Sequence, residues 1–206
     1  MDCHQCHRCD SSPSSRSWWR RWRPAPLESQ LRSSEAQIAL VGMPNVGKSV
    51  LFHALTGVYV TVSNYPGTTV EVSRGLMWVG DRAITAIDTP GMYSAIPMSE
   101  EERVARDVLM SEPLAAVVHV VDAKNLGRML PLAFQLIEAG LPVILAANMM
   151  DEAHRLGLDL RTEILAQELG IPVIPMAAAL NQGIEELRSA IAQKIPAPSP
   201  VTASAV

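Results

Sequence analysis

The chain has 206 residues, of which 48% are hydrophobic and 18% are charged, as in a chain with one packed globular domain. The formal net charge is −4 and divides unevenly: residues 1–35 carry six Arg and four acidic residues, whereas residues 36–206 carry eleven basic and seventeen acidic residues. Because the larger part is acidic, a broad nucleic-acid-binding surface is excluded.

No segment has the composition of a membrane-spanning helix or of a secretory signal peptide. A spanning helix needs roughly 18–20 apolar residues in a row, and no run approaches that length. The first residues include Cys, His and Asp, and no apolar core follows them. The three cysteines all lie within the first nine residues. We therefore expect a cytoplasmic protein in a reducing compartment.

By composition the chain divides into three parts. Residues 1–35 hold Ser-Ser-Pro-Ser-Ser at 11–15 and Pro-Ala-Pro at 24–26, so we expect a disordered N-terminal segment. Residues 36–195 alternate apolar and amphipathic stretches, and we expect one folded domain there. Residues 196–206 are rich in Pro and Ala, and we expect a disordered tail.

Within residues 36–195 the expected strands and helices alternate. Strands are expected at residues 38–41, 70–79, 83–87, 115–121, 143–147 and 173–176, and helices at residues 48–56, 99–110, 126–138, 160–169 and 184–194. Gly80-Asp81 predicts a hairpin turn between the second and third strands. Most strands are apolar throughout, which is typical of a parallel sheet covered on both faces. We therefore predict a three-layer α/β fold, with a mostly parallel sheet and one antiparallel edge hairpin strand.

One stretch has the pattern of a phosphate-binding loop. Residues 42–49 match G-x-x-x-x-G-K-[ST] and lie between an expected strand and an expected helix. Gly42 and Gly47 allow backbone N–H groups to turn inward around phosphates. Lys48 can neutralise the β and γ oxygens, and Ser49 can bind Mg²⁺. The expected nucleotide-binding set also includes Asn45, Val46 and Val50.

A later stretch predicts that the base is guanine. Residues 148–151 read Asn-Met-Met-Asp. This stretch follows an apolar strand at the position of the guanine-specificity motif, which is usually Asn-Lys-x-Asp. The Asp151 carboxylate can accept two hydrogen bonds from guanine, and leaving it unpaired against adenine costs about 1–3 kcal/mol. Met149 replaces the usual lysine, so we expect guanine selectivity with weaker binding. The expected base contacts are Asn148, Met149, Asp151 and, through backbone N–H groups after the last strand, Ala177, Ala178 and Ala179.

Two further stretches are expected to close the site around Mg²⁺ and the γ-phosphate. The motif D-x-x-G runs from Asp88, which would hold Mg²⁺ through water, to Gly91, whose N–H would contact the γ-phosphate. A turn-rich stretch before the hairpin is suited to a switch loop. Within it, Thr69 is the expected ligand of Mg²⁺, and the adjacent Thr68 is the alternative.

Four stretches together resemble the G domain of FeoB, the family of bacterial ferrous iron transporters. They are residues 42–57, 64–71, 88–94 and 148–153. The Asn-Met-Met-Asp form and the Asn-Leu-x-Arg run at residues 125–128 are especially similar, and the likeness covers roughly residues 36–195. The resemblance implies a TRAFAC-class GTPase with a Ras-like P-loop fold that binds GTP and GDP.

The resemblance also implies how hydrolysis is assisted. Met92 follows Gly91 where many switch GTPases carry a water-orienting Gln, so we expect slow intrinsic hydrolysis. In potassium-activated members an Asn of the phosphate-binding loop helps to hold K⁺, and Asn45 has that position here. The bound K⁺ would supply the positive charge that an arginine finger supplies elsewhere. The expected catalytic residues are Lys48, Asn45, Thr69 and Gly91.

The membrane half of the family has no counterpart in this sequence. FeoB proteins continue into a helical regulatory domain and a polytopic membrane domain that carries the iron path. We therefore expect a soluble G subunit acting on a membrane-embedded iron permease, or a truncated product, and the sequence leaves both open. Two other functions also stay open: a nucleotide-sensing module with little turnover, and an Era-like ribosome-associated GTPase.

Residues 1–35 carry two further candidate sites. Three thiols and two imidazoles lie between Cys3 and Cys9, a C-x-x-C-x-x-C pattern that can bind Zn²⁺, Fe²⁺ or an Fe–S cluster. A tail that binds metal incidentally is the alternative. The run from Trp18 to Arg23 combines three Trp with three Arg, which favours peripheral contact with an anionic membrane. A partner-binding or unpacked segment is the alternative there.

Overall fold

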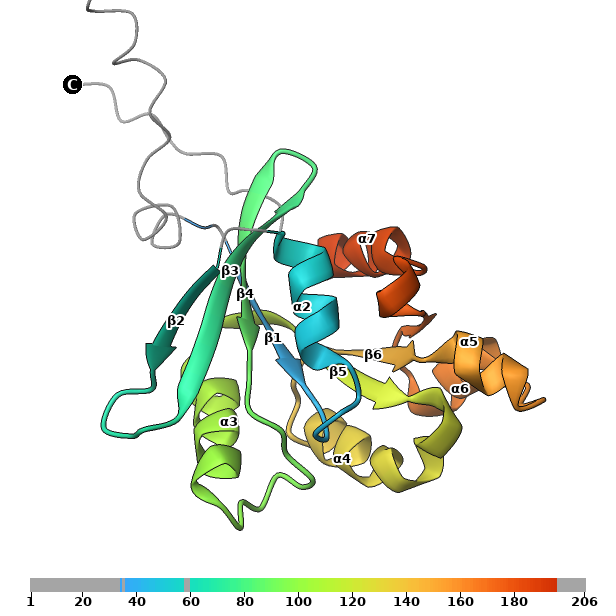
Figure 1. Ribbon diagram of the computed structural model, residues 1–206, viewed down its shortest axis with the longest axis horizontal. Coiled ribbons are helices and arrows are strands. Elements are labelled where there is room, and N and C mark those ends of the chain that lie inside the picture. Colours follow the sequence, from blue (N-terminus) through green and yellow to red (C-terminus); the bar gives the residue numbers. More distant parts are fainter. Residues whose placement is uncertain (1–33, 35, 58–59, 196–206) are drawn as a thin grey trace, which may run out of the picture.

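The computed structural model of the chain describes residues 34, 36–57 and 60–195 (Figure 1). The predictions for the Cys3 to Cys9 run, for the Trp18 to Arg23 run and for the tail concern residues outside this part. In the described ranges no helix is both long and apolar enough to cross a bilayer. The same ranges contain no group of three or more His, Cys, Asp or Glu side chains placed to hold a metal ion.

The described residues form seven strands and six α-helices. In chain order these are β1 (Ala36–Val41), α2 (Lys48–Thr56), β2 (Val60–Asn64), β3 (Glu71–Val79), β4 (Arg82–Asp88), α3 (Glu100–Ser111), β5 (Leu114–Asp122), α4 (Leu126–Glu138), β6 (Val143–Asn148), α5 (Met150–Arg155), α6 (Thr162–Leu169), β7 (Val173–Pro175) and α7 (Ile184–Lys194). Two short 3-10 helices, η2 (Ala123–Asn125) and η3 (Ala178–Leu180), complete the set.

The strands form one sheet in the order β2-β3-β4-β1-β5-β6-β7 (Figure 1). The pairs β1–β4, β1–β5, β5–β6 and β6–β7 are parallel. Strand β3 pairs antiparallel with β4 on one side and with β2 on the other. The predicted α/β class with its hairpin is confirmed, and β2 takes the outer edge beside β3.

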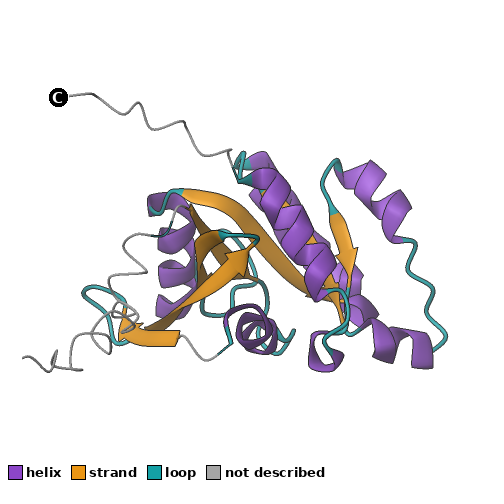
Figure 2. Ribbon diagram, turned by 90° about the horizontal axis from the view of Figure 1, so that it is seen from above, coloured by secondary structure: helices purple, strands orange, loops and turns teal. Residues whose placement is uncertain are grey.

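Two apolar cores lie on opposite faces of the sheet. Along β1, Ile38 and Leu40 belong to one core, and Ala39 and Val41 belong to the other. The first core buries side chains of α2 and α7, and the second buries side chains of α3 and α4. Figure 2 shows the strands between helices, so the three layers are confirmed.

The parallel strands bring the predicted site stretches to one edge of the sheet. The phosphate-binding loop follows β1, Asp88 ends β4 and Asn148 ends β6. Register pairs Leu40 with Asp88, and Asp122 with Asn148, so these strand ends are level with one another. In open α/β sheets this carboxyl edge is where ligands bind.

The sequence patterns missed β2 and α5. Strand β2 lies at the sheet edge and leaves three of its five residues exposed, so it has no apolar face to detect. Helix α5 has six residues, which is too few for a helical period to stand out. The expected helix at residues 160–169 begins two residues later, at Thr162. The expected helix starting near Ser99 is present, and the Ser99 side chain accepts the predicted capping hydrogen bond from Glu102 N.

Candidate functional site

Two glycines let the phosphate-binding loop pass close to its neighbours. Gly42 has φ 151°, and a Cβ there would lie 2.3 Å from the carbonyl oxygen of Val120 on β5. Gly47 has φ 89°, and its Cβ would lie 2.4 Å from the Nδ2 atom of Asn148. Any other residue would push the loop away from β5 and β6. The loop therefore takes its shape from the strands beside it.

The Lys48 ammonium is held inside this loop. Its Nζ atom donates to the carbonyl oxygens of Gly42 (3.1 Å) and Met43 (2.9 Å). The side chain is buried, and burial lowers the pKa of Lys48, although the nearby Asp88 carboxylate opposes that effect. A buried cation without a full counter-charge favours an anionic ligand in the loop.

Ser49 and Asp88 form a pair of oxygen donors beside this cation. The Ser49 hydroxyl donates to Asp88 Oδ2 at 2.8 Å. The other oxygen, Oδ1, is buried and accepts no hydrogen bond from the described residues. Burial raises the pKa of Asp88, opposed by the Ser49 hydrogen bond and the Lys48 charge. A hydroxyl and a carboxylate with an unused oxygen fit Mg²⁺, which prefers oxygen ligands.

The segment after Asp88 is tied to the phosphate-binding loop. Met92 N donates to Gly42 O at 3.0 Å, and Thr89 Oγ1 donates to Leu40 O at 2.7 Å. Gly91 packs directly on Pro44, where a Cβ would lie 2.6 Å from the proline Cγ. The Met92 side chain is fully buried in the core that packs α3. Met92 therefore faces the core, and its side chain cannot orient an attacking water.

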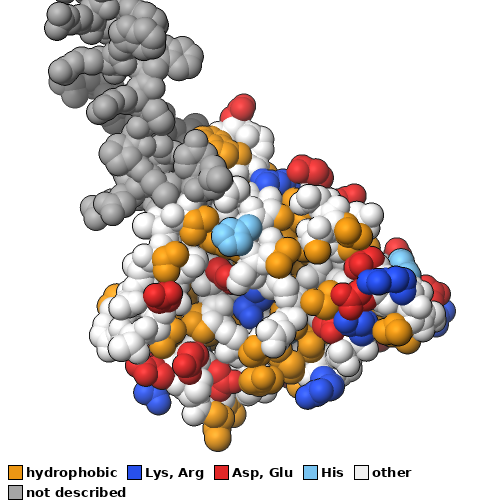
Figure 3. Space-filling view, in the orientation of Figure 1, with side chains coloured by type: hydrophobic (Ala, Val, Ile, Leu, Met, Phe, Trp, Pro, Cys, Tyr) orange, Lys and Arg blue, Asp and Glu red, His pale blue; other side chains and the backbone are white. Residues whose placement is uncertain are grey.

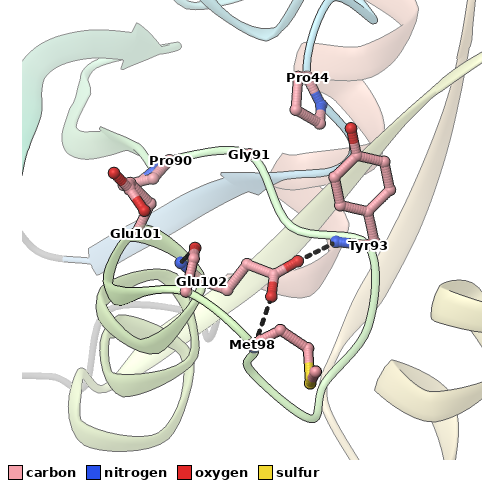
Figure 4. A pocket seen from close by; sticks show the side chains of 8 residues that line it. Pro44, Pro90, Gly91, Tyr93, Met98, Glu101 and Glu102 are labelled. Carbon is pink, nitrogen blue, oxygen red and sulfur yellow. Dashed lines mark hydrogen bonds between the residues drawn. The ribbon is translucent and has the colours of Figure 1, made fainter.

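A pocket of about 440 Å³ lies on the outer side of this segment (Figure 4). The Glu102 carboxylate crosses beneath it and accepts hydrogen bonds from Tyr93 N (3.1 Å) and Met98 N (2.7 Å). These two bonds hold the pKa of Glu102 below its usual value. The pocket walls are apolar side chains and glutamates, which do not suit a phosphate. The loop that holds Lys48 is therefore the better candidate for a phosphate site.

Asn148 joins the phosphate-binding loop to the last loop of the domain. Its Nδ2 donates to Val46 O at 3.0 Å, and its Oδ1 accepts from Ala178 N at 2.9 Å. The side chain is 4% exposed, so both bonds are shielded from water. The prediction placed Asn148 in the guanine motif, and the structure shows its amide, at the end of β6, bridging two loops.

The next residues of this motif enter α5. Met149 adopts a left-handed conformation with φ 63° and precedes the helix. Asp151 lies in the first turn, where its carboxylate makes an ion pair of 3.4 Å with the largely exposed Arg155. An exposed pair at this distance contributes little, so Asp151 is free to exchange it for a ligand.

The three alanines after β7 differ in the use of their backbone N–H groups. Ala177 N donates to Gln182 O at 3.1 Å, and Ala178 N donates to Asn148 Oδ1. Within the described ranges, Ala179 N makes no hydrogen bond. The expected contact with the guanine oxygen therefore narrows to Ala179.

The two candidate threonines of the switch loop are also distinguished. Thr68 Oγ1 donates to Tyr65 O at 3.0 Å and accepts from Val70 N at 3.2 Å. The exposed Thr69 hydroxyl makes no hydrogen bond to any part of the chain that the structure describes, so it is available to a ligand. Asn45 has φ 62°, and its exposed side chain likewise has no described hydrogen-bond partner.

Two side chains beside the site make contacts that the sequence analysis did not predict. Glu102 was expected only as the end of a capping box, and its bonds to Tyr93 and Met98 depend on how the loop folds back over α3. Lys124 lies in η2, where its ammonium pairs with Glu152 of α5. The Glu102 contacts are local, to residues four and nine positions away, whereas the Lys124–Glu152 contact joins segments 28 residues apart and follows no spacing rule.

Replacing Asn148 by Ala tests its bridging position. The change leaves the Val46 carbonyl and the Ala178 N–H buried without partners, so we expect the free energy of unfolding to fall by about 2–4 kcal/mol. Urea unfolding measures it. Gln167→Ala, on the exposed side of α6, is the control and should change stability by at most about 0.5 kcal/mol. A loss below about 1 kcal/mol for Asn148→Ala would contradict the bridge.

The chain is similar to known proteins of one family. A family model described as Ferrous iron transport protein B (FeoB_N) matches residues 36–191. The Fe(2+) transporter FeoB of Escherichia coli (strain K12) is 40% identical over 158 residues, covering 75% of this chain and 20% of that protein. The chain therefore spans about a fifth of the length of the curated relatives it matches.

Solved structures agree with the family and with the fold. The FeoB G-domain from Methanococcus jannaschii matches with TM-score 0.69 and 39% identity, covering 79% of this chain and 98% of that one. The cytosolic domain of T. maritima FeoB in its GMPPNP form matches with TM-score 0.76 and 37% identity, covering 80% of this chain and 65% of that one. The cradle around Lys48, the family model and these structures lead to one conclusion: the chain belongs to the FeoB family, and residues 36–191 carry its P-loop G domain.

Proposed function

We propose that this chain binds GTP and GDP and hydrolyses GTP to GDP and phosphate. One observation carries the proposal: at the carboxyl edge of the sheet, a buried lysine lies inside a glycine loop beside a hydroxyl–carboxylate pair. That arrangement suits a nucleoside triphosphate with its metal ion. The FeoB relative from T. maritima in its GMPPNP form supports the same nucleotide class.

Different residues of the site are proposed to contact the phosphates, the metal ion and the base. Lys48 binds the β and γ oxygens, and the Gly91 N–H contacts the γ-phosphate when the segment after Asp88 closes. Ser49, Asp88 and Thr69 would hold Mg²⁺, which when bound supplies positive charge against the phosphate oxygens. The remaining nucleotide contacts are proposed to come from the loop backbone and the base motif: Gly42, Asn45, Val46, Gly47, Val50, Asn148, Met149, Asp151 and, of the three alanines after β7, Ala179. Because Met92 is buried, no side chain at that position orients water, and we propose a slow intrinsic rate.

Base selection is proposed to depend on Asp151, so its conversion to Asn should change the preferred base. Asn offers an N–H donor where the carboxylate accepted from the guanine amine, which suits the carbonyl of xanthine. We expect Asp151→Asn to weaken GDP binding by about tenfold or more and to strengthen binding of xanthosine diphosphate. Competition against a fluorescent nucleotide measures both. Asp159→Asn, an exposed control beyond α5, should bind as the unaltered chain does. Unchanged preference in Asp151→Asn would refute this role.

Potassium activation is proposed to depend on Asn45. Its side chain is exposed at the mouth of the phosphate-binding loop, and K⁺ held there would add positive charge near the β and γ phosphates. We expect single-turnover GTP hydrolysis to be about tenfold or more faster in KCl than in NaCl. Asn45→Gly, which tolerates φ 62°, should lose the difference and keep GDP affinity. Equal rates in the two salts would remove K⁺ from the mechanism. Negligible turnover in both would favour the nucleotide-sensing alternative.

We also propose that residues 36–195 act as a cytoplasmic G domain of a ferrous iron uptake system, with a membrane-embedded iron permease as partner. The FeoB match supports this role over the Era-like alternative. Membrane contact through Trp18 to Arg23 and metal binding between Cys3 and Cys9 stay predictions.

The iron role can be tested in cells that lack ferrous iron uptake. The chain is co-expressed with a FeoB membrane domain deprived of its own G domain, and accumulation of Fe²⁺ is measured. We expect uptake with the unaltered chain and loss of uptake with Lys48→Met, because the loop then lacks its cation. Equal uptake with and without the chain would contradict the coupling.

A further inference from the structure

The helix that carries Asp151 has few residues to hold it in place. Helix α5 spans six residues, and isolated helices shorter than about 12 residues are marginal in water. Its start is fixed on the sheet side by Met150 N, which donates to Met176 O at 3.1 Å, and by the fully buried Ala153. The side of the first turn that faces η2 needs a further contact to fix its rotation.

Lys124 supplies that contact from the neighbouring strand end. Strand β5 ends at Asp122, which is in register with Asn148 at the end of β6. Asp122 shapes η2: its Oδ1 accepts from Lys124 N and its Oδ2 accepts from the Asn125 side chain, both at 2.9 Å. This folded turn directs the Lys124 side chain to α5, where its ammonium forms an ion pair and a hydrogen bond with Glu152.

The environment of Lys124 is acidic and partly shielded. Its side chain is 22% exposed, and its ammonium also lies 3.9 Å from Asp122 Oδ2. The Glu152 hydrogen bond raises the pKa of Lys124, and the charges of Asp122 and Asp151 add to that effect. One cation thus lies among three carboxylates beside the base motif. Figure 3 shows basic and acidic side chains together over the end of the molecule that carries α5.

The position matters because the motif itself lacks a lysine. The whole chain has three: Lys48 in the phosphate-binding loop, Lys194 at the end of α7, and Lys124. With Met149 in place of the usual lysine, the first turn of α5 has two adjacent carboxylates: Asp151 pairs with Arg155 of the same helix, and Glu152 pairs with Lys124. Without a counter-charge, Glu152 repels Asp151 at the place where the carboxylate must align with the base.

We propose that Lys124 is a positioning residue for guanine recognition: by binding Glu152 it fixes the first turn of α5 so that Asp151 accepts from both guanine donors. The inference rests on the proposed function, since it presumes that Asp151 binds the base. In this proposal Lys124, which lies outside the Asn-x-x-Asp motif, contributes to guanine recognition, and Glu152 is the residue of α5 that it binds.

The ratio of GDP to inosine diphosphate affinity tests this role. Inosine lacks the exocyclic amine, so the ratio reports the second hydrogen bond of Asp151 and not helix stability. In the full chain, we expect Lys124→Met to lower the ratio about fivefold to tenfold through weaker GDP binding. Lys124→Arg should restore most of the ratio, because it keeps the ion pair. Glu152→Gln should lower it similarly, and the double variant should be no worse than either single one.

Lys194→Met is the matched control, an exposed lysine on α7 whose loss should leave both affinities unchanged. An unchanged ratio in Lys124→Met, or a ratio insensitive to Glu152→Gln, would overturn the proposal. So would an equal loss of GDP and inosine diphosphate binding, which marks a purely structural role. If the unaltered chain does not prefer GDP over inosine diphosphate, the proposed guanine recognition by Asp151 fails instead, and the two failures are thereby distinguished.

Discussion

The Asn148 side chain is the interaction on which the rest of the site depends. Its amide reaches Val46 O in the phosphate-binding loop and Ala178 N in the loop after β7, and both bonds are buried. The same side chain occupies the space that a Cβ at Gly47 would need. The loops for phosphate and for base are therefore fixed relative to each other before any ligand arrives, which reduces the entropy lost on binding.

Beside these two loops lie a buried cation and a carboxylate with a buried oxygen that a ligand could pair with. Lys48 is buried with backbone carbonyls as its nearest partners, and Asp88 retains a buried oxygen that no described residue satisfies. Burial lowers the pKa of Lys48 and raises the pKa of Asp88, and the charge of each group partly opposes the shift of the other. A magnesium nucleotide offers an anion to one group and a cation to the other. The segment after Asp88 runs from this site to the surface, where the Glu102 carboxylate accepts hydrogen bonds from Tyr93 N and Met98 N.

Much of the fold could be predicted because its signals are local. The helix at Lys48–Thr56 and the helix at Leu126–Glu138 begin and end where their apolar periods and glycines indicate. Strand β2 and helix α5 could not be predicted, because pairing with β3 and packing against η2 and Met176 stabilise them more than their own residues do. The Lys124–Glu152 ion pair could not be predicted either, because it joins η2, after β5, to α5, after β6.

The sequence by itself determined the α/β class, the phosphate-binding loop and the motif that ends in Asp151, because each depends on residue types at short fixed spacings. Only the tertiary structure decided which groups are free to act. It uses the N–H groups of Ala177 and Ala178 and the hydroxyl of Thr68 internally, leaves Ala179 and Thr69 available, and turns Met92 into the core. The physical reason is that a hydrogen-bonding group has limited capacity, and its partners come from strands and loops brought together by folding.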